Sequence, residues 1–143
     1  MHLAIDGHGG DTAKMWDAQL VRDFLLRCPD ELGMTRITDP EVLEYNAPSP
    51  EDSGISGFVI IAESHISIHT FPRREYVNID IFSCRPFDDQ RVLSEAKDLF
   101  GLEQVRSWLL DRGLEWLDGR QGLVEVKQQR TALESGGLDR PRG

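Results

Sequence analysis

The sequence lacks several features that would indicate particular classes of protein. It contains no apolar run near the roughly 20 residues that a membrane-spanning helix needs, and its first residues lack the basic and then apolar regions of a signal peptide. Basic residues are few: 16 Lys and Arg stand against 25 Asp and Glu, a formal net charge of −9. Because phosphate binding calls for clustered cations, this balance argues against a nucleic-acid surface. We therefore expect a cytoplasmic protein that binds neither membrane nor nucleic acid.

Cysteine is also scarce, since the chain has only Cys28 and Cys84. Without a secretion signal, both thiols are expected to stay reduced rather than to form a disulfide. Cys28 falls in an apolar stripe with Leu20, Val21, Phe24 and Leu25, which favours a small buried residue on a helix.

The pattern of apolar residues predicts one α+β domain over residues 1–127, followed by a polar, Gly-rich tail over 128–143 that is expected to be disordered. Pro29 is expected to end the first helix and Gly101 the second. Strands and helices are grouped rather than alternating, which favours a two-layer sandwich of a mostly antiparallel sheet with helices on one face. The expected strands are 2–6, 56–62, 66–70, 76–83, 105–110 and 123–126, and the expected helices are 15–28 and 88–100.

The dipeptide Glu63-Ser64 is the strongest chemical signal in the chain. It lies at a predicted turn between two β-branched, apolar segments. A Ser hydroxyl is a poor nucleophile and an amide a poor electrophile, so cleavage here requires Ser64 to be held against the Glu63 carbonyl, where proximity replaces reactivity. The sequence Ala62-Glu63-Ser64-His65 lacks the glycines of a G-x-S-x-G nucleophile elbow, which argues against a serine hydrolase.

A metal site is not indicated by the two histidines that follow. His65 and His69 are four residues apart on a predicted strand, a separation of roughly 13 Å, whereas two ligands of one zinc ion each lie about 2 Å from it. We therefore expect no metal.

Four short motifs occur together in an order that identifies a family. They are Gly54-Ile55-Ser56-Gly57, Ala62-Glu63-Ser64-His65, Ile68-His69-Thr70-Phe71-Pro72 and Asp80-Ile81-Phe82-Ser83-Cys84. In these motifs, and more weakly outside them, the chain resembles the S-adenosylmethionine decarboxylase proenzymes in their short prokaryotic form.

The resemblance implies a self-cleaving enzyme. The chain would cut itself between Glu63 and Ser64 into residues 1–63 and 64–143, and Ser64 would become a pyruvoyl cofactor that forms a Schiff base with the substrate amine. By the family pattern, Ser56 and His69 serve processing, with His69 suited to act as the general base and Ser56 to position the carbonyl. Cys84 would protonate the decarboxylated product. The family also implies a homodimer of processed chain pairs.

The substrate is less closely defined by the motifs. S-adenosylmethionine is the first expectation, with Phe71 as a stacking platform for the adenine, Asp6 near the substrate, and Arg73 able to bind a carboxylate. Three positions depart from the usual pattern: Phe71 stands where many members carry Trp, Arg73 where an acidic residue is common, and Pro50 where an aromatic residue is common. Arginine or ornithine is therefore the alternative substrate, and a catalytically inactive relative a further alternative.

Overall fold

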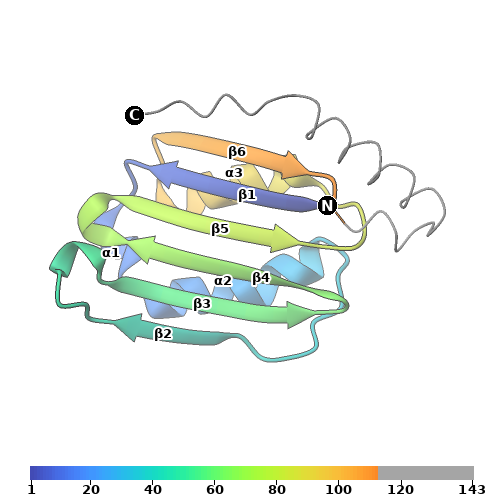
Figure 1. Ribbon diagram of the computed structural model, residues 1–143, viewed down its shortest axis with the longest axis horizontal. Coiled ribbons are helices and arrows are strands. Elements are labelled where there is room, and N and C mark those ends of the chain that lie inside the picture. The colour runs from blue at the N-terminus through green and yellow to red at the C-terminus, as the bar shows by residue number, and fades with distance from the viewer. Residues whose placement is uncertain (113–143) are drawn as a thin grey trace, which may run out of the picture.

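A computed structural model describes residues 1–112 of the 143-residue chain (Figure 1). Six strands form a single sheet in the order β2-β3-β4-β5-β1-β6, and every neighbouring pair is antiparallel. The expected fold class is confirmed. The strands are β1 (His2–His8), β2 (Glu41–Tyr45), β3 (Gly54–Ile61), β4 (Ser64–Phe71), β5 (Tyr76–Phe82) and β6 (Gln104–Leu110).

Among residues 1–112, helices cover one face of the sheet and no helix covers the other, which is called the open face below. Helices α2 (Ala18–Glu31) and α3 (Asp89–Phe100) both lie behind the sheet in Figure 1. Alternate residues along each central strand point toward them and are buried, because strand side chains alternate between faces. Gly57 shows how tightly these layers pack, since a Cβ there would lie 2.9 Å from Leu25 Cδ1. The core-facing strand residues are Leu3, Ile5, Ile55, Val59, Ile61, Ile66, Ile68, Val77, Ile79 and Ile81.

The helices begin and end at residues with clear capping roles. The short helix α1 (Thr12–Met15) is capped by Asp11 and α2 by Asp17, each through side-chain bonds to two backbone N–H groups. Helix α3 ends at Gly101, which has φ of 64° and so takes the left-handed conformation expected of it. In the described part of the chain, no helix is both long enough and apolar enough to cross a membrane.

The prediction that Pro29 ends the first helix is wrong. Helix α2 continues to Glu31 with Pro29 buried inside it, and the separate helix α1 precedes it. Pro29 lies in the last turn, where its missing N–H removes a single hydrogen bond. Beyond it, Leu32 N–H donates to the Cys28 carbonyl and Met34 N–H to the Pro29 carbonyl, so that the turn still closes.

Other boundaries differ less, and two expectations lie outside the described residues. Each expected strand up to residue 110 is present with shifts of a few residues at its ends, and β2 occupies part of a segment expected to be only partly extended. The expected strand 123–126 and the disordered tail 128–143 belong to the part of the chain that the structure does not describe.

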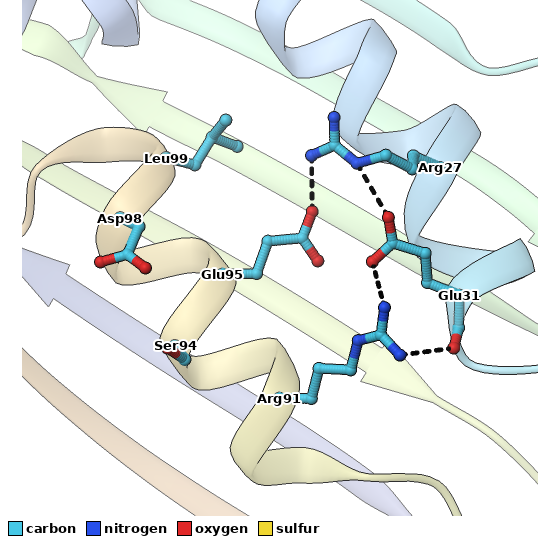
Figure 2. A pocket seen from close by; sticks show the side chains of 7 residues that line it. All are labelled: Arg27, Glu31, Arg91, Ser94, Glu95, Asp98 and Leu99. Atoms are coloured by element: carbon cyan, nitrogen blue, oxygen red, sulfur yellow. Dashed lines mark hydrogen bonds and ion pairs between the residues drawn. The ribbon is translucent and has the colours of Figure 1, made fainter.

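An ion-pair network joins the two long helices on their outer side (Figure 2). Arg27 contacts Glu31 at 3.1 Å and Glu95 at 2.6 Å, and Arg91 contacts Glu31 at 2.9 Å. The groove between α2 and α3 that these residues line has a volume of about 710 Å³. Its two cations and two of its three carboxylates neutralise one another, so the groove offers little charge for recognising a ligand.

Candidate active site

Ser64 lies at the start of β4, directly after the turn Ala62-Glu63 that connects it to β3. Its Oγ accepts a hydrogen bond of 3.1 Å from the backbone N–H of Cys84, which follows the end of the neighbouring strand β5. The Cys84 thiol lies 3.9 Å from Ser64 Oγ and 3.7 Å from the carbonyl oxygen of Glu63. The structure therefore brings the expected nucleophile, the expected scissile carbonyl and the expected proton donor together in one cluster.

Cys84 contacts both groups of the expected cleavage site, the Ser64 hydroxyl and the Glu63 carbonyl oxygen. The N–H of Cys84 donates to the hydroxyl of Ser64, and the Cys84 thiol, a weak donor, lies against the Glu63 carbonyl oxygen. A donor in this position would stabilise charge that develops on the oxygen if the carbonyl were attacked. The sequence motifs had suggested a role for Cys84 only in turnover. The backbone of Cys84 could not be foreseen as the group that positions Ser64, because it comes from a segment 20 residues further along the chain.

Ser56 and His69 form a second cluster, on the open face. They are directly opposite each other in the pairing of β3 with β4, and His69 Nδ1 lies 2.9 Å from Ser56 Oγ. A hollow of about 380 Å³ adjoins them, and its apolar lining includes Leu43 and Phe58. The two residues expected to serve processing are thus coupled to one another at a concave, partly apolar surface.

The two clusters lie far apart within one chain. Ser64 begins β4 and His69 is five residues along it, which in an extended strand is about 16 Å. The His69 imidazole therefore does not reach the Cα proton of Ser64 in the same chain, although the two residues are close in sequence.

The expected substrate-binding residues also lie at the end of the sheet away from Ser64. Phe71, at the end of β4, has its ring 5.8 Å from that of Tyr76, at the start of β5. Asp6 pairs with Asn78 across β1 and β5 and accepts a 2.8 Å hydrogen bond from its amide. Arg73 lies in the short 3-10 turn Pro72–Arg74 between these strands, exposed and without an ion pair among residues 1–112.

Tyr76 lies with the expected substrate-binding residues Phe71 and Asp6 and was not predicted from the sequence. It contacts Phe71 on one side and His8, at 4.7 Å, on the other, which makes an aromatic row on the open face. Burial, followed by a hydrogen bond with Asp6, raises the pKa of the Tyr76 phenol, so it stays a neutral donor at physiological pH. Tyr76 falls on the face of β5 opposite the apolar residues Val77, Ile79 and Ile81, and this position in the sequence could have identified it.

The two thiols should differ sharply in reactivity, because their surroundings differ. Cys28 is 1% exposed, and burial raises its pKa to about 12, whereas Cys84 is partly exposed. In the native protein near pH 8, a disulfide reagent such as DTNB should therefore modify one thiol, at Cys84, and a second only on denaturation. Peptide mapping of the labelled protein checks the assignment, and fast native labelling of Cys28 would contradict it.

Comparisons with known proteins establish the family of the chain. A family model described as S-adenosylmethionine decarboxylase matches residues 1–113. Two similar relatives carry the name S-adenosylmethionine decarboxylase proenzyme: one from Archaeoglobus fulgidus is 32% identical, covering 78% of this chain and 96% of the relative. The other, from Clostridium botulinum strain Langeland, is 31% identical, covering 78% and 92%.

A solved structure shares the fold. The adenosylmethionine decarboxylase from Aquifex aeolicus superposes with a TM-score of 0.65 at 24% identity, covering 78% of this chain and 88% of that one. The match of the family model to most of the chain, together with the similarity of the relatives over nearly their full length, shows that this protein belongs to the S-adenosylmethionine decarboxylase family.

Proposed function

We propose that the protein is a self-processing, pyruvoyl-dependent decarboxylase that acts on S-adenosylmethionine and so supplies an aminopropyl donor for polyamine synthesis. One observation carries the proposal: Ser64 Oγ is held by the Cys84 N–H beside the Glu63 carbonyl, whose oxygen faces the Cys84 thiol. The proposal extends to this chain the activity for which its relatives are named.

Maturation would proceed through an ester. The Ser64 oxygen bonds to the Glu63 carbonyl carbon as the carbon–nitrogen bond breaks and the nitrogen takes a proton. A base then removes the Cα proton of Ser64, the bond from Cβ to oxygen breaks, and Glu63 leaves as a carboxylate. The dehydroalanine that remains adds water and releases ammonia, which converts residue 64 to a pyruvoyl group. The hydroxyl, carbonyl and thiol of this cluster fit that origin for the cofactor.

The pyruvoyl carbonyl supplies an electron sink for the loss of carbon dioxide from an amino acid. Cys84 would act in the last step of turnover, the protonation of the decarboxylated product. Its thiol, beside residue 64, can deliver the proton that replaces the lost carboxylate.

We further propose that the active enzyme is a homodimer in which each site takes residues from both chains. The open face is rich in exposed apolar side chains, which favours burial against a second copy. When two such sheets stack about a twofold axis that runs across their strands, the Ser64 end of one β4 lies over the Phe71 end of the other. The exposed apolar residues of this face are Leu43, Tyr45, Phe58, Ile60, Trp108 and Leu110.

The dimer explains why the site residues of one chain lie at opposite ends of its sheet. Ser64 and Cys84 of one copy would meet Ser56, His69, Phe71 and the Asp6 region of the other. His69 could then act as the base in processing, which its distance from Ser64 in the same chain prevents.

Two measurements on the purified full-length chain test the proposed function. Denaturing mass spectrometry should show two fragments that divide between Glu63 and Ser64, with the larger blocked to N-terminal sequencing. Carbon dioxide release should then be assayed with S-adenosylmethionine, arginine, ornithine and lysine, each labelled at the carboxyl carbon. A single uncut, inactive chain would indicate the inactive relative, and release from arginine or ornithine alone would replace the proposed substrate.

Replacing Phe71 with Ala should raise the KM for S-adenosylmethionine by about tenfold while self-cleavage proceeds as before. Stacking on an aromatic ring contributes to binding the adenine, not to cutting the chain. Phe71→Leu keeps the apolar bulk without the ring and should resemble Phe71→Ala, whereas Phe71→Tyr should resemble the parent. Steady-state kinetics on fully cut protein provide the measurement, and an unchanged KM in Phe71→Ala would remove Phe71 from the substrate site.

A further inference from the structure

A small polar pocket lies beside the scissile turn, in addition to the hollow on the open face. It has a volume of about 130 Å³ and combines three segments that are distant in sequence. The loop after α2 forms one wall, the turn that carries the scissile bond forms another, and the segment after β5 forms the third. The lining residues are Leu32, Gly33, Met34, Thr35, Ala62, Glu63, Ser83, Arg85 and Pro86.

A cationic side chain without an ion-pair partner among the described residues lines the pocket. Arg85 lines it, and within residues 1–112 the Arg85 guanidinium makes no ion pair. A second cation, Arg36, follows Thr35 in the chain but does not itself line the pocket, and among residues 1–112 its Nη1 is buried without a hydrogen-bond partner. A buried guanidinium N–H that is left unpaired is unfavourable, so an anion within reach of Arg36 would be stabilised.

The scissile strand is fixed to the same region. Arg36 forms a β-bridge with Ile61, and Ala62 N–H donates a 2.8 Å hydrogen bond to the Thr35 carbonyl. Chain cleavage leaves both contacts in place, because they involve residues before the cut. The new chain end, Glu63, therefore directly follows a residue that is hydrogen-bonded to Thr35, and both Ala62 and Glu63 line the pocket.

We propose that this pocket is a binding site for the α-carboxylate that self-cleavage creates at Glu63, with Arg85 as its direct partner and Arg36 as supporting charge. The inference rests on the proposed self-cleavage. An amide carbonyl of Glu63 is neutral, but the ester elimination converts it to a carboxylate beside residue 64. An amino acid substrate brings its own carboxylate to that position, so the new charge would repel it unless it moved away.

Capture of this carboxylate would also release Cys84. In the uncut chain the thiol contacts the Glu63 carbonyl oxygen at 3.7 Å. When Glu63 turns toward Arg85, that contact ends, and the thiol is free to face the substrate. The pocket thus links the end of processing to the start of turnover, through a pair of charges that exists only after the cut.

The state of the Glu63 chain end tests the proposal directly. Fully cut wild-type enzyme, Arg85→Gln and a control, Lys97→Gln, should each be incubated with carboxypeptidase Y, and the mass of chain 1–63 followed. Carboxypeptidases must bind a free terminal carboxylate, so an end paired with Arg85 should resist. We expect Arg85→Gln to lose Glu63 about tenfold faster than wild type, and Lys97→Gln, which removes an exposed charge from helix α3, to match wild type.

The outcomes separate this inference from the proposed function. If the wild-type chain is never cut, the proposed function fails and no Glu63 carboxylate exists. If it is cut but Arg85→Gln and wild type are trimmed at the same rate, the pocket does not hold the carboxylate and the inference is overturned. Arg36→Lys, which keeps the charge, should be trimmed more slowly than Arg36→Gln. Equal rates for these two would remove Arg36 from the site.

Discussion

Replacing Ser64 with Ala should leave a single uncut chain of 143 residues that has no decarboxylase activity. The change removes the hydroxyl that accepts a hydrogen bond from the Cys84 N–H. That hydroxyl is the proposed nucleophile, and its oxygen is the one that leaves Cβ in the elimination that forms the dehydroalanine. The backbone, the β3–β4 pairing and the core-facing Ile61 and Ile66 are unchanged, so the variant should fold. Denaturing mass spectrometry after purification provides the measurement.

Ser94→Ala is the matched control. Ser94 lies on helix α3, in the groove between α2 and α3, and so away from both the scissile turn and the open face of the sheet. It should be cut normally. Efficient cutting of Ser64→Ala, or failure of both variants to be cut, would show that Ser64 is not the nucleophile or that its contribution to cleavage is not chemical.

The fold could be predicted from the sequence where side-chain period and turn chemistry agree. Alternation of Val77, Ile79 and Ile81 with polar residues fixed the strand β5 and its buried face, and Gly101 marked the end of α3 because a left-handed residue is needed there. Pro29 gave a wrong helix end. The loss of helix stability that a proline causes depends on where in the helix it lies and on whether neighbouring N–H groups close the last turn. That information is in the three-dimensional packing rather than in the residue type.

The site was harder to predict than the fold. The motifs named Ser64, His69 and Cys84, but closeness in sequence says little about distance along an extended strand. Cys84 is 20 residues from Ser64 and in contact with it, whereas His69 is five residues away and about 16 Å distant. The pocket beside Glu63 has no sequence motif at all, because Thr35, Glu63 and Arg85 come together only when the sheet forms.

The separation of Ser64 from His69 leads to the last prediction, which concerns two inactive chains that restore each other. His69→Ala alone should be cut at least about 100-fold more slowly than wild type, since elimination needs a positioned base. Ser64→Ala alone should not be cut. When both variants are produced together in one cell, mixed dimers should contain one complete site, made of Ser64 from the His69→Ala chain and His69 from the Ser64→Ala chain.

Only the His69→Ala chain of a mixed dimer can be cut, which makes the result quantitative. Random pairing gives about half of the dimers as mixed, so about a quarter of all chains should be processed. Distinct tags on the two variants identify the cut chain by mass, and size-exclusion chromatography with light scattering establishes the dimer. A base acting within its own chain predicts no cutting in the mixture, because neither variant then holds both groups. Cutting of the Ser64→Ala chain would contradict both arrangements, whereas selective cutting of the His69→Ala chain requires that the two ends of β4 meet across a twofold axis.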